Sequence, residues 1–309
     1  MGQLSAPSPP RGLVIREAEE QDLDRVAVLL QAADDARVMS VDGLRHRRKT
    51  RPERGRMIDI VAELDGLVVG TGGAGLNTDT TTAGAGRAFL TVDVEHRRQG
   101  IGDALGATLV DHLRSLGATK ATSLIRWAEE GERWALARGW SRLLTGPLIA
   151  VDPRGIPEPS TRPGFRCVAM RDVAPEDAYT AITAAAIDEP SPVPNDDIRL
   201  EDFLQEWNDP DFDLGASTAV VDETGRVAAF AFIAVVGDRA QHGFTGTLRE
   251  YRDRGLATAA KRAALRGAAA RGVTRVTTSN AEENEAMRAI NAKLGFQQIG
   301  EHVILGRDL

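Results

Sequence analysis

The sequence is poor in cysteine and has no long apolar run, and each shortage excludes a class of protein. Cys167 is the only cysteine in 309 residues, so no disulfide can form within the chain, and a reducing, cytoplasmic location is expected. No apolar run approaches the roughly 18 residues that cross a membrane. The net charge of −7 argues against general binding of nucleic acid. Residues 1–11 are rich in proline and serine, which predicts a flexible N-terminal tail.

One short motif, with a strand-like run before it and a helical pattern after it, occurs twice. The copies are Arg97-Arg98-Gln99-Gly100-Ile101-Gly102 and Arg252-Asp253-Arg254-Gly255-Leu256-Ala257. The first turn of a helix binds anions because its N–H groups are unpaired and carry a partial positive charge. Small residues there leave the backbone open to a phosphate. Each copy therefore predicts a pyrophosphate-binding turn, whereas the Rossmann and Walker glycine patterns are absent.

The two motifs belong to a longer repeat. Gly100 and Gly255 are 155 residues apart, and Gly139 and Gly295 are 156 apart. Residues 152–164 hold four prolines and two glycines, which is typical of a linker. The repeat predicts two similar domains, at residues 12–151 and 165–309, joined by that linker.

The order of elements in each unit predicts the class of fold. We expect long strands at 86–94 and 242–247 before the motifs, helices at 100–116 and 256–271 after them, and a helix at 283–294. A helix that joins two strands implies a parallel pair. The turns at Asp65-Gly66 and Thr224-Gly225 imply antiparallel hairpins. Together these features predict an α/β protein with mixed sheets flanked by helices.

Strand, motif, helix, strand, and then a helix that ends in Leu294-Gly295-Phe296, resemble the GNAT superfamily of acetyl-CoA-dependent N-acetyltransferases. The second unit matches closely, and the first matches more loosely, ending in Ala137-Arg138-Gly139-Trp140. The resemblance covers nearly the whole chain. It implies two tandem GNAT-like domains, acetyl-CoA as cosubstrate, no metal, and direct transfer without an acyl-enzyme.

The resemblance also implies which positions bind the coenzyme. In the second unit, Thr245 and Thr247 would line the pantetheine arm, and Asn280 and Asn284 would bond it. The remaining positions are those of the two pyrophosphate turns and the strand end before the first: Arg252, Arg254, Gly255, Leu256, Ala257, and Val92, Val94, Arg97, Arg98, Gln99, Gly100, Ile101 and Gly102. For the two asparagines, a helix cap or turn is the alternative. We place Asn284 inside the helix, which favours a ligand there.

The catalytic groups depart from the pattern of the family. Many members carry a tyrosine as general acid four residues before the glycine of the Gly-Phe pair, and here those positions are Asn291 and Ala135. His242, on the second motif strand, is the candidate general base, and a solvent-facing histidine is the alternative. In the first unit, Asp93 and Glu95 are the equivalent candidates, with solvent-facing side chains as the alternative.

Two runs of charge lie between the first helix and the hairpin of each unit. Residues 45–56 hold seven Arg or Lys against Glu53, and residues 188–213 hold ten Asp or Glu against Arg199. In an acceptor cleft, the acidic run would attract a cationic amine and the basic run an anionic group. The alternatives are that both runs are solvated or that they face each other between the units.

The sequence thus predicts an enzyme that moves an acetyl group from acetyl-CoA to a primary amine of a small molecule. We expect the second unit to be the catalytic one and a homodimer to be possible. The alternatives are a non-catalytic acyl-CoA sensor, a protein or peptide N-acetyltransferase, and a transferase that uses charged tRNA. Substrate depends on the cleft loops, so the fold does not name the acceptor.

Overall fold

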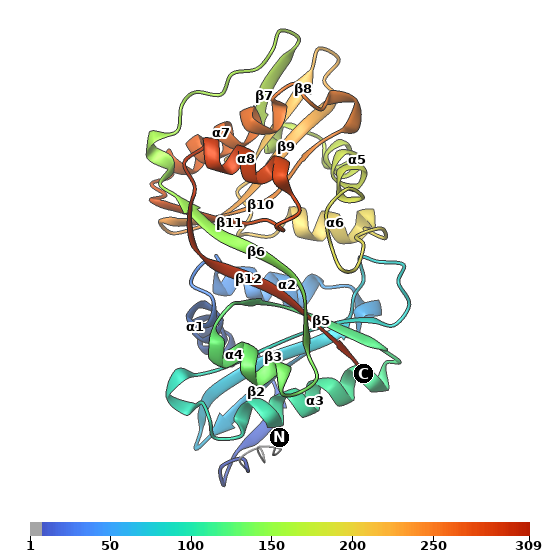
Figure 1. Ribbon diagram of the computed structural model, residues 1–309, viewed down its shortest axis with the longest axis vertical. Coiled ribbons are helices and arrows are strands. Elements are labelled where there is room, and N and C mark those ends of the chain that lie inside the picture. Colours follow the sequence, from blue (N-terminus) through green and yellow to red (C-terminus); the bar gives the residue numbers. More distant parts are fainter. Residues whose placement is uncertain (1–7) are drawn as a thin grey trace.

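The computed structural model describes residues 8–309 and shows two similar halves (Figure 1). Most of the predicted tail, residues 1–7, lies outside the described residues. The first half supplies β1 (Val14–Glu17), α1 (Leu23–Ala33), α2 (Val41–Thr50), β2 (Ile58–Leu64), β3 (Leu67–Leu76), β4 (Ala85–Val92), α3 (Ile101–Ser115), β5 (Lys120–Arg126), α4 (Glu129–Leu136) and β6 (Ser141–Val151). The second half supplies β7 (Phe165–Ala169), α5 (Pro175–Ala186), α6 (Leu200–Trp207), β8 (Thr218–Asp222), β9 (Val227–Val236), β10 (Arg239–Thr247), α7 (Leu256–Ala269), β11 (Arg275–Ser279), α8 (Glu285–Lys293) and β12 (Gln297–Asp308).

All the strands join in one mixed sheet. Its order is β1-β2-β3-β4-β5-β12-β6-β11-β10-β9-β8-β7. Among the strands of residues 8–309, only β4 with β5 and β10 with β11 are parallel, and the other neighbouring pairs are antiparallel. The predicted α/β class and the two hairpins are confirmed, and the parallel pairs are the ones joined by a helix.

The halves exchange their closing strands. β12 lies between β5 and β6, and the far edge of β6 pairs with β11. In Figure 1 these two long strands cross the middle of the molecule side by side. At the last residue, the N–H of Leu309 bonds the carbonyl of Thr119 at 3.0 Å. Division of the chain at residues 152–164 stays a prediction, and the sheet itself runs without a break through both halves.

Helices cover both faces of the sheet because strand side chains alternate between them. In the first half, Val61 packs with residues of α1, whereas its neighbours Ile60 and Ala62 pack with residues of α3. In the second half, Val220 packs with α7, and Ala219 packs with α5. The central strands are therefore buried on both faces, and each motif helix lies against its own half of the sheet.

The acidic and basic runs face each other across the two halves. Arg47 on α2 bonds Asp209 at 2.6 Å and Asp211 at 2.9 Å, and Arg54 pairs with Asp202. The facing arrangement, one of the sequence-based alternatives, is confirmed for these pairs. Much of the acidic run is thus neutralised within the chain, which weakens it as an attractor of cationic amines.

Asp211 is the best-bonded member of this interface. Its carboxylate is 3% exposed and accepts hydrogen bonds from the amide and hydroxyl of Ser40, which caps α2, and from Arg47. A Cβ at Gly43 would lie 2.0 Å from that carboxylate, so glycine is needed for the helix to approach so closely.

We predict that Asp211→Ala lowers the free energy of unfolding by about 3–5 kcal/mol, because Ser40 and Arg47 lose a buried partner. Glu158→Ala is the matched control, since Glu158 pairs with Arg266 on the surface and is 76% exposed. Glu158→Ala should lower the free energy of unfolding by about 0.5 kcal/mol or less. Urea unfolding measures both, and equal losses would contradict the interface as described.

Candidate functional site

The two motif turns have the same backbone. Arg98 and Gly100 have φ angles of 64° and 78°, and the equivalent Asp253 and Gly255 have 62° and 76°. The glycine caps the motif helix in each case. Such alternation of left-handed residues at a helix start directs successive N–H groups into one concavity, which suits an anion.

The motif arginines brace these turns from the side. Nε of Arg97 donates to the carbonyl of Val92 at 3.2 Å, and Nε of Arg252 donates to that of Thr247 at 3.3 Å. Each carbonyl belongs to the last residue of the strand before the turn. Buried Ile101 and Leu256 anchor the helix on its other side. The arginine bond therefore fixes how the strand enters the turn.

In each half, the parallel strands separate before they reach the turn. β4 pairs with β5 only from Ala85 to Arg87, and β10 pairs with β11 only from Arg239 to Gln241. Beyond these points the motif strands keep only the partner on their other side. In the second half a bulge between His242 and Thr245 shifts the register with β9, whereas β4 pairs with β3 without a shift. The separation leaves unpaired strand edges where an extended ligand can lie.

Buried polar side chains surround the separation in the second half. Lys261 on α7 is 1% exposed, with Nζ 3.9 Å from Sδ of Met287 and 5.5 Å from the ring centre of Phe296. Burial lowers the pKa of Lys261 to about 7. Nearby, Nδ2 of Asn291 donates to Oδ1 of Asn280 at 2.5 Å. A lysine with a depressed pKa beside a strand break is a candidate for a functional site.

Three buried polar atoms here have no hydrogen-bond partner within residues 8–309. They are Nε2 of His242, Oγ1 of Thr245 and Oδ1 of Asn291. An unpaired buried polar atom costs about 1–3 kcal/mol, so such groups are usually satisfied. Their presence on one motif strand and on α8 favours a ligand that carries both donors and acceptors.

The first half repeats the backbone but not these side chains. When Gly100 is matched with Gly255 and Gly139 with Gly295, Gly106 stands in place of Lys261 and Ala135 in place of Asn291. A Cβ at Gly106 would lie 3.3 Å from the ring of Trp134, which fills that space. Among the described residues, the polar lining therefore belongs to the second half alone.

The two turns also differ in access. Gly255 is exposed, and a Cβ there would meet nothing within 4 Å, whereas Gly100 is buried. Beside the first turn, Glu130 lies 3.4 Å from Arg98 and 3.8 Å from Arg97. A carboxylate in that place disfavours a phosphate by like charge. The second turn is the better anion site.

Several predicted residues have partners within the chain. Arg252 and Arg249 both pair with Asp188, and Arg254 lies over the rings of Phe165 and Tyr251 at 5.9 and 5.7 Å. Arg249 and Arg252 hold the pKa of Asp188 far below its ordinary value. Arg252 would have to leave Asp188 in order to meet a phosphate.

The prediction that Asn284 lies inside a helix is wrong. Asn284 is the cap of α8, and its Oδ1 accepts a hydrogen bond from the amide of Met287 at 3.2 Å. Asn favours this position because its short side chain satisfies a free N–H of the first turn. Asp93 does the same for the amide of Glu95 at 3.2 Å and also pairs with Arg25.

The solvent-facing alternative for His242 is also wrong. The side chain is 2% exposed, and burial together with the charge of Lys261 lowers its pKa well below the ordinary value. A general base near neutral pH needs a pKa close to the working pH. Its role as base stays a prediction, and the depressed pKa counts against it.

Sequence reasoning missed Lys261, which the structure places against Met287 and close enough to His242 to lower its pKa. The residue stands in an alanine-rich helix, where a lysine normally faces solvent. The available signal was its spacing, because Lys261 lies on the same face as Ala260, Ala264 and Leu265, which are fully buried.

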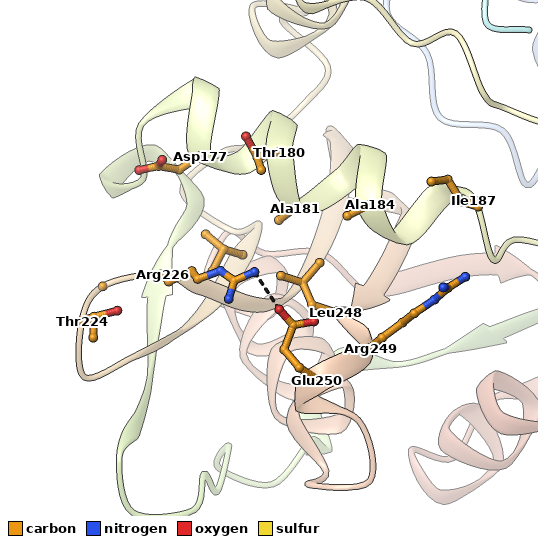
Figure 2. Close-up of a pocket in the computed structure, with 12 residues that line it drawn as sticks. Asp177, Thr180, Ala181, Ala184, Ile187, Thr224, Arg226, Leu248, Arg249 and Glu250 are labelled. Carbon is orange, nitrogen blue, oxygen red and sulfur yellow. Dashed lines mark hydrogen bonds and ion pairs between the residues drawn. The ribbon is translucent and has the colours of Figure 1, made fainter.

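A surface pocket lies elsewhere in the second half. It measures about 710 Å³ and is lined by α5, the turn between β8 and β9, and residues 248–250 (Figure 2). Arg226 and Glu250 pair with each other at 2.7 Å on its wall. None of the unpartnered buried atoms faces it, so we place the site at the strand separation.

No helix within residues 8–309 has the length and apolar character needed to cross a membrane. No three His, Cys, Asp or Glu side chains of that range are grouped as metal ligands.

The chain is similar to known acetyltransferases over almost its whole length. The family described as acetyltransferase (GNAT) matches residues 17–137 and again 181–296. A mycothiol acetyltransferase of Amycolatopsis mediterranei is 29% identical, over 94% of this chain and 97% of that protein.

Solved structures agree on the fold. A tandem GNAT protein from the clavulanic acid biosynthesis pathway has a TM-score of 0.76 and 22% identity, over 96% of this chain and 98% of that one. A GCN5-related N-acetyltransferase of Sphaerobacter thermophilus has a TM-score of 0.73 and 16% identity, over 97% of both chains.

Lys261 should make stability depend on pH. Its pKa is about 7 when folded and ordinarily 10.5, so the unfolded chain binds more protons between these values and stability rises with pH there. We predict that Lys261→Met raises the free energy of unfolding by roughly 3–5 kcal/mol at pH 7 and has little effect near pH 10.5.

Urea unfolding at several pH values measures this difference. Lys293→Met is the control, because Lys293 lies exposed at the end of α8 and should show no pH-dependent gain. A constant difference between wild type and Lys261→Met from pH 7 to 10 would contradict a buried neutral amine.

Proposed function

The chain belongs to the acetyltransferase (GNAT) family, and from that premise we propose that its second half transfers acetyl from acetyl-CoA to a primary amine of a small molecule. The observation that carries the proposal is the strand separation in that half, with its open glycine turn and its unpartnered polar atoms. The first half has the same backbone but an apolar filling, so we assign it a structural role.

The coenzyme fits the separation by its chemistry. Its pyrophosphate would meet the N–H groups from Asp253 to Ala257 at the start of α7. Its pantetheine amides would pair with the free edge of β10 and with polar groups of Thr245, Asn280 and Asn291. The bound coenzyme supplies an activated thioester, and the protein holds an amine against it.

Direct transfer fits the placement of Cys167. It lies on β7 at the far edge of the sheet, separated from β11 by β8, β9 and β10. Burial raises the pKa of its thiol, which disfavours the nucleophilic thiolate. We therefore propose attack by the acceptor amine on the thioester, with no acyl group passing through Cys167.

A non-catalytic acyl-CoA sensor is the second candidate. The observation that favours it is Asn291, which occupies the position expected for a general acid and is bonded to Asn280 instead of facing open space. Turnover decides between the two. An amine panel that includes the acceptor of the mycothiol acetyltransferase relative is the suitable probe, with thiol release from acetyl-CoA as readout.

We predict that Gly255→Glu abolishes binding of acetyl-CoA, because an anionic side chain would occupy the turn, whereas Gly100→Glu retains it. Calorimetric titration measures both. Gly272→Glu is the matched control, since Gly272 also has a positive φ, of 83°, and open space around it, but lies beyond the end of α7. The control reproduces the backbone strain and the added charge.

Each other outcome has a definite meaning. Loss of binding only in Gly100→Glu would move the working site to the first half. Loss in all three variants would show strain and not a site. Failure of wild type to bind acetyl-CoA would contradict the proposal, and tight binding with no thiol release for any amine would favour the sensor.

A further inference from the structure

A chain of hydrogen bonds links a serine, a histidine and an aspartate beside the strand separation. Oγ of Ser279 lies 3.1 Å from Nδ1 of His302, and Nε2 of His302 lies 3.0 Å from Oδ2 of Asp34. The histidine is 7% exposed and the aspartate side chain 14% exposed. Ser279 ends β11, His302 is on β12, and Asp34 follows α1, so both halves of the molecule contribute.

The hydrogen bonds from Ser279 to His302 and Asp34 lie on the face of the sheet opposite α7. On β11, Val276 packs with Leu265 and Ala268 of α7, and the alternation of side chains turns Thr277 and Ser279 to the other face. The hydroxyl of Thr277 accordingly donates to the carbonyl of Ala36 in the first half, at 2.7 Å. The buried lysine and Ser279 therefore lie on opposite sides of the gap.

Ser279 lies at the level where the strands have parted. The last pair between β10 and β11 joins Gln241 to Thr277, and Ser279 is two residues further on. On β10, two residues beyond Gln241 is Gly243, within the bulge. Ser279 therefore lies at the height of the bulge, on the end of β11 that no longer pairs with β10, and its hydroxyl reaches across β6 to His302.

The two partners fix the tautomer of His302. Ionised Asp34 can only accept, so Nε2 of a neutral His302 carries the hydrogen, and Nδ1 accepts from the hydroxyl of Ser279. Burial is the largest influence on the pKa of Asp34 and raises it, but the contacts with His302, the amide of Ala36 and the charge of Arg37 together lower that pKa below its ordinary value. The imidazole is thus held with its basic nitrogen toward Ser279.

We propose that Ser279 and His302 remove the proton of the acceptor ammonium in the second half, with Asp34 as the positioning residue. This inference rests on the proposed function. The ammonium gives one proton to the Ser279 oxygen as the hydroxyl hydrogen passes to Nδ1 of His302, and the imidazolium later releases that proton to water. The free amine forms the C–N bond as the C–S bond breaks, and its next N–H proton accounts for the thiol proton of coenzyme A.

Several other charged groups lie near the histidine. Arg126, opposite His302 on β5, pairs with Asp35, and Arg275 on β11 lies 3.7 Å from the same carboxylate. On β12 itself, Glu301 is the neighbouring residue. Asp34 is the carboxylate bonded to the ring, and Arg37 is the positive side chain whose charge acts on Asp34.

The first half has no serine at the position that corresponds to Ser279. Its last parallel pair joins Arg87 to Thr122, so the position equivalent to Ser279 is Leu124, which carries no hydroxyl. The leucine is 48% exposed. Proton removal by this route is therefore possible in the second half alone among residues 8–309. The polar residues Lys261 and Asn291 likewise have no polar counterpart in the first half.

The test measures kcat/KM for the most active amine of the panel, from pH 6 to pH 10, with acetyl-CoA saturating. Ser279→Ala and His302→Gln should lower it about 100-fold or more at pH 7, within the usual range for acid–base catalysis. Their values of kcat/KM should rise with pH until the acceptor ammonium loses its proton to solvent without help, and should there approach wild type. The KM for acetyl-CoA should not change.

Two further variants separate chemistry from structure. Ser279→Thr keeps a hydroxyl and should retain most of the activity. Thr277→Val removes the neighbouring hydroxyl bond to the first half without touching His302, so its pH profile should match wild type.

Each remaining outcome overturns the inference. If Ser279→Ala and Thr277→Val give the same small loss with unchanged profiles, the bonds only hold the halves together. If wild type turns over an amine and neither Ser279→Ala nor His302→Gln alters the pH profile of kcat/KM, proton removal through Ser279 and His302 (the relay) is wrong and the proposed function stands. If wild type turns over no amine, the proposed function fails first, and the relay with it.

Discussion

The site depends on two parallel strands that stop pairing. β10 and β11 share main-chain hydrogen bonds only as far as Gln241 and Thr277, and β10 then bulges away from its former register. Peptide groups that lose a partner strand need another partner, and an extended ligand with amides of its own can supply it. The break also sets the places of the other parts, with the glycine turn at the end of β10, Lys261 on one face and Ser279 on the other.

The two halves show that a shared backbone does not impose shared chemistry. Both have the strand break and the same left-handed turn residues. Yet Lys261, Asn291 and Ser279 have Gly106, Ala135 and Leu124 as their counterparts. Where the second half keeps polar atoms without partners, the first fills the space with Trp134. The first half therefore gains packing at the positions where the second retains reactive groups.

Local patterns predicted what is local. The motif turns, the two hairpins, helix α5 and strand β11 were predictable because glycine, capping and alternation act over a few residues. The exchange of β6 and β12 was not, since an apolar strand pattern does not name its partner across 150 residues. The start of the last helix was predicted two residues too early, at 283 where α8 begins at Glu285, and this error placed the capping residue Asn284 inside the helix. Ser279 and His302 are 23 residues apart in the sequence, and their side chains meet across β6, which lies between β11 and β12.

The exchanged strands also govern how the protein can be made. The strand between β5 and β6 is residues 297–308, so the centre of the sheet cannot form before these residues are synthesised, long after the first half has left the ribosome. Contacts of such long sequence separation form slowly, and open strand edges favour aggregation while they wait. A nascent chain that stalls after β11 would thus carry the other strands of the sheet without β12, and its unpaired strand edges would be open to chaperones and proteases.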